Sequence, residues 1–140
     1  MLNQNAKKWL EALRSGKYQQ TKSALCDVGN GEPDRFCCFG VACDLYFQEH
    51  PELKSEIYDD RFYPRRKFLG ELEVLPHQVQ AWLGLRTSTG DYGSDYVGAL
   101  TEDNDEGKTF EEIATIIESE PARLFAELRP DTGTSEPVQS

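Results

Sequence analysis

The chain has 140 residues, of which 38% are hydrophobic and 11% aromatic. These proportions are typical of a folded protein with a buried core and exclude a disordered chain. No apolar run is long enough to span a membrane, and the amphipathic start predicts no secretion signal. The formal net charge of −10 disfavours binding to nucleic acid or to anionic membranes. We therefore expect a cytoplasmic protein with reduced cysteines.

The acidic charge lies mainly in the last part of the chain. Residues 101–140 carry 11 acidic and 3 basic side chains, whereas residues 1–100 carry 14 and 12. An acidic surface serves solubility, and it also suits a basic partner protein. The residues that we expect to form such a partner-binding surface are Asp103, Asp105, Glu106, Glu111, Glu112 and Glu118.

The N-terminal region predicts a helix followed by strands. One helical face is formed by Ala6, Trp9, Leu10 and Leu13. Asn3 or Asn5 would cap this helix, and Gly16 would end it. Residues 18–25 and 35–38 are strand-like, and we expect them to pair as a hairpin around the Gly-Asn-Gly turn at 29–31.

A buried helix is expected after Gly40, which we interpret as a break following the second strand. This helix would end near His50, because Pro51 disfavours a helical residue before it. Residues 51–70 suggest an irregular segment with a possible short helix or strand. Its basic cluster at 65–67 would be solvated or paired with Asp59, Asp60 and Glu71.

The second half alternates helices with polar loops. Residues 75–84 predict a helix, with Pro76 in its first turn and Gly84 as its stop. Residues 86–98 predict a loop or small hairpin, and residues 101–107 an acidic turn. Thr109 and Glu112 form a capping box for the next helix. Pro121 would restart a helical turn, with Leu124, Phe125 and Leu128 on one side.

We considered metal and thiol chemistry for the four cysteines. Cys26, Cys37, Cys38 and Cys43 lack the paired spacing of a zinc knuckle, and adjacent residues on a strand point to opposite faces. Cys38 with His50 or His77 would supply the groups of a thiol hydrolase, but nothing in the sequence brings them together. We therefore expect buried free thiols and assign no catalytic residue, metal or cofactor.

Two loops remain as candidates for ligand binding. Residues 102–113 resemble a calcium loop, but Ile113 occupies the position that needs a bidentate glutamate, so we exclude an EF-hand. The glycine-rich 86–98 loop lacks the phosphate-loop pattern. Its Arg86, Tyr92 and Tyr96 could still contact a nucleotide or another small ligand.

Four sequence blocks carry a resemblance to a known group of proteins. They are KWLEALRSGKYQQ at 8–20, FCCFGVACDL at 36–45, LPHQVQAWLGL at 75–85 and NDEGKTFEEIA at 104–114. In this order they resemble a family of small uncharacterised proteins from tailed phages and prophages, whose members often have Leu at the position of Phe39. The resemblance implies a phage setting and assigns no activity, cofactor or catalytic residue.

These observations predict an α+β, helix-rich single domain over residues 1–129, followed by a disordered tail at 130–140. Four or five helices would pack on a small antiparallel hairpin or sheet. The residues expected to be largely buried are Trp9, Leu13, Phe36, Cys38, Val41, Leu45, Val79, Trp82, Ile113 and Ile117.

Three functions are compatible with this sequence. The first is a non-enzymatic phage accessory protein that binds a basic host protein through the acidic surface, in host takeover or defence against host immunity. The second is a small-molecule or nucleotide-binding protein that uses the 86–98 loop. The third is a cysteine- or metal-dependent enzyme.

Overall fold

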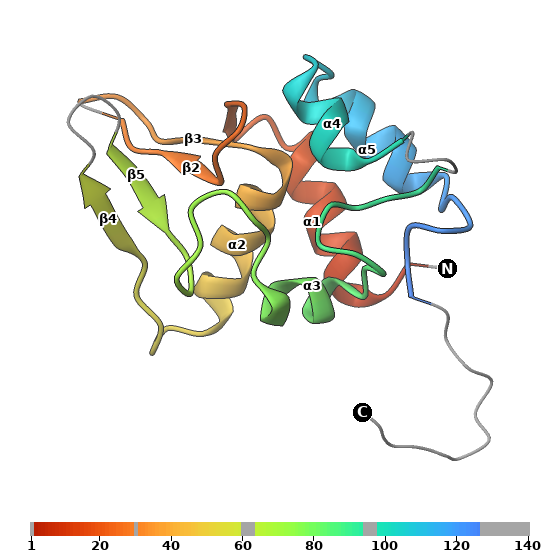
Figure 1. Ribbon diagram of the computed structural model, residues 1–140, viewed down its shortest axis with the longest axis horizontal. Helices are drawn as coiled ribbons and strands as arrows, with labels where there is room; N and C mark the ends of the chain where they lie inside the picture. Colours follow the sequence, from red (N-terminus) through yellow and green to blue (C-terminus); the bar gives the residue numbers. More distant parts are fainter. Residues whose placement is uncertain (1, 30, 60–63, 94–97, 127–140) are drawn as a thin grey trace.

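The structure is a computed structural model that describes residues 2–29, 31–59, 64–93 and 98–126. Within these ranges it has five α-helices and a five-stranded mixed sheet, which confirms the predicted α+β class. The sheet lies on one side of helix α2, and helices α1, α4 and α5 lie on the other (Figure 1). No helix in the described part is long and apolar enough to cross a membrane.

Most helix ends coincide with the predicted caps and stops. The Asn3 side chain accepts a hydrogen bond from the Ala6 N–H at 2.8 Å, Gly84 ends its helix at a φ of 79°, and Thr109 and Glu112 form the capping box. The helices are α1 (Gln4–Arg14), α2 (Cys38–Glu49), α3 (His77–Leu83), α4 (Leu100–Asp105) and α5 (Phe110–Glu118).

The sheet is small, and its strands follow the order β1-β3-β2-β5-β4. Only the β1–β3 pair is parallel, so the expectation of a purely antiparallel sheet is wrong at this edge. Of the predicted strand at 18–25, only Gln19 and Gln20 form a strand; the hairpin partner of β3 is β2 instead. The strands are β1 (Gln19–Gln20), β2 (Cys26–Asp27), β3 (Arg35–Phe36), β4 (Glu56–Asp59) and β5 (Pro64–Lys67).

Helix α2 begins earlier than the sequence predicts. Cys37 has extended backbone angles and is the N-cap, and its Sγ accepts a hydrogen bond from the Gly40 N–H at 3.4 Å. Cys38 is therefore helical rather than part of a strand, and Gly40 lies in the first turn of the helix rather than breaking the chain.

Gly40 is needed because the chain preceding β2 touches it. A Cβ atom at position 40 would lie 1.7 Å from the carbonyl oxygen of Leu25. The same oxygen accepts a hydrogen bond from the Cys37 N–H at 3.3 Å. This close approach joins the sheet to the start of α2 and leaves no room for a side chain at Gly40.

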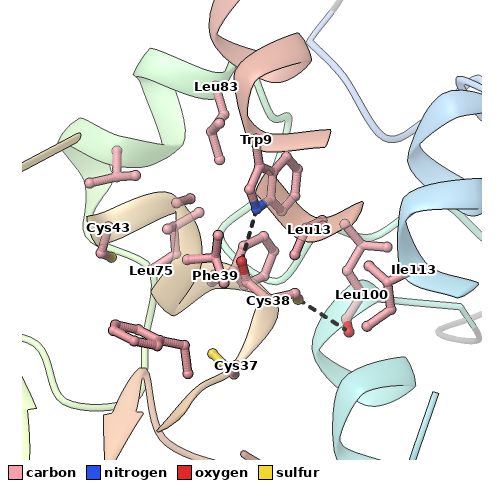
Figure 2. Close-up of a cluster of buried hydrophobic side chains, with 14 of the residues drawn as sticks. Trp9, Leu13, Cys37, Cys38, Phe39, Cys43, Leu75, Leu83, Leu100 and Ile113 are labelled. Carbon is pink, nitrogen blue, oxygen red and sulfur yellow. Dashed lines mark hydrogen bonds between the residues drawn. The ribbon is translucent and has the colours of Figure 1, made fainter. Parts of the chain in front are cut away.

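The core is centred on Trp9, which is fully buried on α1. Its indole Nε1 donates a hydrogen bond to the Cys38 carbonyl at 2.8 Å, and its ring stacks on Phe39 with centroids 5.7 Å apart (Figure 2). The residues expected to be buried are buried, except that Leu45 and Trp82 are only partly covered and pack against the core.

Two other segments differ from their predictions. The expected acidic turn at 101–107 is largely the helix α4, because Asp103 and Asn104 are buried and hydrogen-bonded. Residues 51–70 contain the β4–β5 hairpin. The described part of the 86–98 loop is irregular, as expected, and residues 122–124 form a turn. The predicted tail at 130–140 and Leu128 lie outside the described residues.

Replacing Gly40 by alanine tests the contact with Leu25. An alanine ordinarily favours a helix by about 1 kcal/mol over glycine. Here the new methyl group would overlap a backbone carbonyl, so we expect Gly40→Ala to lower the free energy of unfolding by about 3 kcal/mol. Urea denaturation followed by circular dichroism measures the change.

Gly16→Ala is the control for this substitution. Gly16 has a φ of 76°, and a Cβ added there would meet no atom within 4 Å, so only backbone strain of about 1–2 kcal/mol is expected. A Gly40→Ala protein as stable as the wild type would contradict the close approach.

Candidate functional site

A cleft of about 280 Å³ opens beside the start of α2. It brings together the chain before β2, the N-terminus of α2, the segment before α3 and helix α4. This volume lies just below the range of pockets that enclose drug-sized ligands, so it suits one side chain or a small molecule. The lining residues are Ser23, Ala24, Cys37, Cys38, Phe39, Glu73, Val74, Thr101, Asn104 and Asp105.

Asn104 organises the inner wall of the cleft. It is 1% exposed, and its Oδ1 accepts hydrogen bonds from the Cys38 N–H at 3.1 Å and from Gln20 Nε2 at 2.8 Å. Its Nδ2 donates to the Thr21 carbonyl at 2.8 Å. A single amide thus joins β1, the start of α2 and α4, and fixes the relative positions of three walls of the cleft.

The N-terminus of α2 is not free to bind an anion. Asn104 Oδ1 accepts a hydrogen bond from the Cys38 N–H, and the Cys37 Sγ accepts one from the Gly40 N–H. The helix therefore satisfies these first-turn donors with its own neighbours, whereas an anion site would leave such donors open.

The thiols beside the cleft are poor nucleophiles at neutral pH. Burial raises the pKa of Cys37 to about 11, and the hydrogen bond from the Gly40 N–H lowers it only in part. Burial also raises the pKa of Cys38 and of Cys43 well above the usual value. Because the thiolate is the reactive form, these cysteines behave as small core residues.

The histidines do not complete a thiol or metal site in the described part of the chain. His50 stacks on Tyr46, and its Nδ1 lies 2.7 Å from the Tyr46 carbonyl oxygen. His77 is exposed on α3. No group of three histidine, cysteine or acidic residues among the described residues could hold a metal ion.

The rim of the cleft is acidic and its lining is partly apolar. The exposed Asp105 uses Oδ1 to accept a hydrogen bond from the Ser23 N–H at 2.8 Å. Glu73, whose side chain is 61% exposed, pairs with Arg65 at 3.1 Å. Val74 also lines the cleft and leaves 51% of its surface exposed. The arrangement combines two carboxylates with apolar surface in one small opening.

Two of the residues predicted for ligand binding in the 86–98 loop, Arg86 and Tyr92, have structural partners. The Arg86 Nε donates to the Arg123 carbonyl at 2.7 Å, which fastens the loop to the turn after α5. The Tyr92 hydroxyl donates to Asp103 Oδ2 at 2.5 Å. Burial and then this hydrogen bond raise the pKa of Tyr92. Tyr96 lies outside the described residues.

The residues predicted to form the acidic surface differ in their exposure and contacts. Asp103 is only 6% exposed and faces Tyr92, so its place on a partner-binding surface is wrong. Glu106 and Asp105 are exposed at the end of α4. Of the remaining predicted residues, Glu111 and Glu118 both pair with Arg14 at 3.0 Å, and Glu112 serves the capping box.

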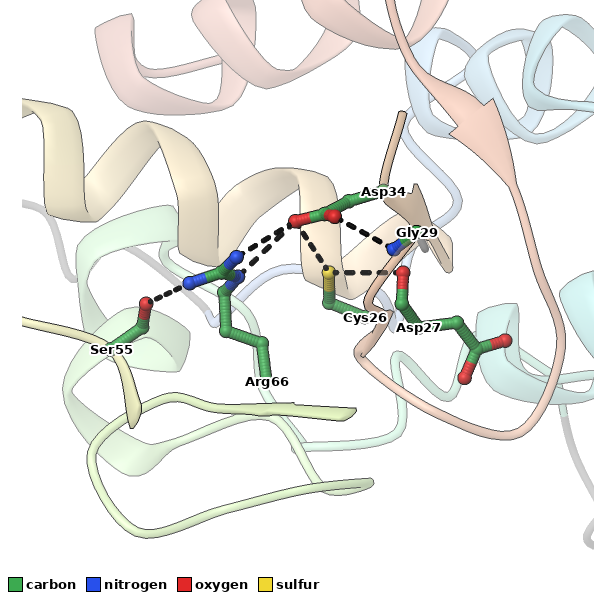
Figure 3. Close-up of polar contacts among 6 residues, drawn as sticks. All are labelled: Cys26, Asp27, Gly29, Asp34, Ser55 and Arg66. Atoms are coloured by element: carbon green, nitrogen blue, oxygen red, sulfur yellow. Dashed lines mark hydrogen bonds and ion pairs between the residues drawn. The ribbon is translucent and has the colours of Figure 1, made fainter. Parts of the chain in front are cut away.

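Two residues of the basic cluster at 65–67 form ion pairs, Arg65 with Glu73 and Arg66 with Asp34, whereas the predicted partner Asp60 lies outside the described residues. Asp34 Oδ2 accepts from the Arg66 guanidinium at 3.0 Å, and Arg66 also donates to Ser55 Oγ at 3.0 Å (Figure 3). Cys26 lies beside the same carboxylate with its Sγ 3.8 Å away. Burial, then the charge of Asp34, raises the pKa of Cys26 to about 12. This half-buried cluster holds the sheet to the loop after β2.

Sequence reasoning does not find the cleft itself. Its wall residues come from four separated segments, and Glu73, Val74 and Thr101 belong to no motif. The clearest available signal is Asn104 inside the fourth sequence block, where the pattern predicts a solvated turn.

Removing the Asn104 amide tests its role as the connection between the cleft walls. We expect Asn104→Ala to lower the free energy of unfolding by about 3 kcal/mol, because it leaves the buried Cys38 N–H and Thr21 carbonyl without their partner. Urea denaturation measures the loss. Asn5→Ala, which removes one partly buried bond to Trp82, should cost about 1 kcal/mol. Equal losses would contradict the assignment.

Because the thiols are buried, we expect the free energy of unfolding to fall at alkaline pH. The folded pKa values of Cys37 and Cys26, about 11 and about 12, lie above the roughly 8.5 of an unfolded thiol. Between these values the unfolded chain has released protons that the folded protein retains. The free energy of unfolding should therefore be fully retained below about pH 8 and fall as the pH rises toward 11.

Urea denaturation at pH 7, 9 and 10.5 measures this effect. Cys37→Ala should flatten the fall relative to the wild type, even if it lowers stability at every pH. An unchanged slope in the variant would show that Cys37 does not contribute.

Comparison with known proteins identifies the family. A model of the family described as "Domain of unknown function (DUF8296)" matches residues 1–121, which include every residue lining the cleft. No curated protein and no solved structure matches the chain. Since the match covers most of the 140 residues, the chain belongs to the DUF8296 family.

Proposed function

We propose that this is a non-enzymatic binding protein that anchors a lysine or arginine side chain of a basic partner protein in the acidic cleft. The observation that carries the proposal is that Glu73, Asp105 and the apolar Val74 line one opening of about 280 Å³. A long basic side chain has an aliphatic stem and a cationic head. The stem would contact Val74 and Ala24, and the head would meet the two carboxylates.

The charge of the whole protein supports the same partner. A net charge of −10 accelerates the encounter with a basic surface and repels phosphate groups. A nucleotide has less support, because the cleft rim is acidic and Arg86 is bonded to the chain itself. A thiol enzyme has less support because the pKa of Cys37 is raised to about 11.

The biological setting is part of the proposal. The four sequence blocks resemble phage and prophage proteins, so the partner would be a protein of the bacterial host, met in its cytoplasm. Binding would serve host takeover or neutralise a defence factor. The setting rests on the resemblance, whereas the chemistry of the partner rests on the cleft.

A labelled hexa-arginine peptide tests the cleft by fluorescence polarisation. We expect Glu73→Gln combined with Asp105→Asn to weaken binding at least tenfold, which corresponds to about 1.4 kcal/mol. The amide at 105 can still accept the hydrogen bond from Ser23, so the fold should be retained. Circular dichroism and thermal melting check this.

The matched control is Glu111→Gln combined with Glu118→Gln. It changes the net charge by the same two units, but at carboxylates outside the cleft; they pair with Arg14, as Glu73 pairs with Arg65. We expect less than a threefold loss of affinity for this control. Equal losses in the two double variants would mean that net charge alone attracts the peptide, and the cleft proposal would then be wrong.

A further inference from the structure

Strand β4 (Glu56–Asp59) lies at the end of the sheet order, and one of its edges pairs with no strand of the described residues. It pairs with β5 on its inner side, and no other described strand pairs with its outer side. All four of its residues are exposed, and Figure 1 shows the hairpin projecting from the side of the molecule away from α1 and α5. Unpaired strand edges are templates for the addition of another strand.

The pairing register determines which backbone groups face outward. The Val28 N–H donates to the Pro64 carbonyl at 3.0 Å, so the backbone groups of Pro64 face β2. Successive residues of a strand alternate, so those of Arg65 face β4 and its partner Tyr58 faces inward. The N–H and C=O groups of Ile57 and Asp59 therefore point away from the sheet.

The exposed edge also carries unusual apolar surface. Ile57 is 55% exposed and Tyr58 46% exposed, and both are among the largest exposed apolar residues of the described chain. Outward backbone groups and exposed apolar side chains together offer hydrogen bonds and contact area to an added strand.

The charges on β4 select a basic strand over a second copy of this protein. Glu56 and Asp59 are acidic, and the inner neighbour β5 places Lys67 opposite Glu56. Lys67 Nζ also lies 5.6 Å from the centre of the Tyr58 ring. An added basic strand would repeat this pattern on the outer side. A second copy would instead bring two more carboxylates to the same short edge of a protein with net charge −10.

We propose that the outer edge of β4 binds a short extended segment of a partner protein in which lysine or arginine alternates with apolar residues. Its backbone would exchange hydrogen bonds with Ile57 and Asp59, and a basic side chain would lie near Glu56 and Tyr58. This surface is separate from the cleft, and the inference does not depend on the proposed function.

The test uses the full chain carrying Glu73→Gln and Asp105→Asn, so that the cleft does not contribute. The probe is the labelled peptide Lys-Val-Lys-Val-Lys, compared with Glu-Val-Glu-Val-Glu by fluorescence polarisation. We expect the lysine peptide to bind at least tenfold more tightly than the glutamate peptide.

Ile57→Pro removes the outward N–H without removing a hydrogen bond to β5, because the Ile57 N–H faces away from that strand. We expect it to weaken the lysine peptide at least tenfold, whereas Ile57→Val keeps the N–H and should change affinity less than threefold. Circular dichroism checks that both variants are folded. Proline is tolerated on edge strands.

A second variant keeps the proposal testable if Ile57→Pro disturbs the hairpin. Glu56→Gln combined with Asp59→Asn should reduce the preference for the lysine peptide to less than threefold. Three outcomes would overturn the proposal: no binding of the lysine peptide, binding unaffected by both variants, or a dimer in analytical ultracentrifugation that Ile57→Pro dissociates. The last would assign the edge to a second copy.

Discussion

A backbone contact between Leu25 and Gly40 determines how the sheet meets the helices. The Leu25 carbonyl oxygen occupies the space that any side chain at position 40 would need, and it also accepts the Cys37 N–H. Since the start of α2 is held against the chain before β2, the Cys38 carbonyl is fixed where the Trp9 indole can donate to it. Ala24 and Cys37, next to this contact in the chain, both line the cleft, so the cleft and the centre of the core share one constraint.

Buried polar residues also hold these segments together. Asn104 is almost fully buried and binds α4 to two other segments, which is why a highly acidic stretch of the chain folds as a helix instead of a solvated turn. Asp103 is likewise satisfied by Tyr92. The number of acidic residues in the C-terminal part therefore does not show how much unpaired negative charge lies on its surface. Arg14 pairs with two carboxylates of α5. At the cleft, Glu73 pairs with Arg65 and Asp105 accepts a hydrogen bond from the Ser23 N–H, and both side chains remain exposed.

Local signals are sufficient to predict α1, α3 and α5, because helical periodicity, the Asn3 cap, Gly84 and the Thr109 capping box act within a few residues.

Local signals fail where the hydrogen bonds that determine the structure join residues distant in sequence. The bond between Asn104 and Thr21 spans 83 positions, and nothing near Asn104 indicates it. The strand that we predict at Cys37 is wrong, because Cys37 is instead the N-cap of α2. This role depends on the turn that Leu25 and Asn104 impose. For residues 51–70 the sequence leaves a short helix or strand open without assigning either, because Glu56–Asp59 and Pro64–Lys67 lack the alternation of a half-buried strand. The cleft could not be predicted, since its walls meet only after all these contacts form.

The proposed function depends above all on the entry of a basic side chain into the cleft. Chemical-shift mapping of the ¹⁵N-labelled protein with N-acetyl-arginine methylamide tests this entry most directly, because the probe has one guanidinium group and is too short to add as a strand. We expect the largest amide shifts at Ala24, Val74 and Asp105, and we expect Glu73→Gln with Asp105→Asn to remove them. Shifts concentrated on α5 around Glu111 and Glu118, or spread evenly over all acidic residues, would contradict binding in the cleft.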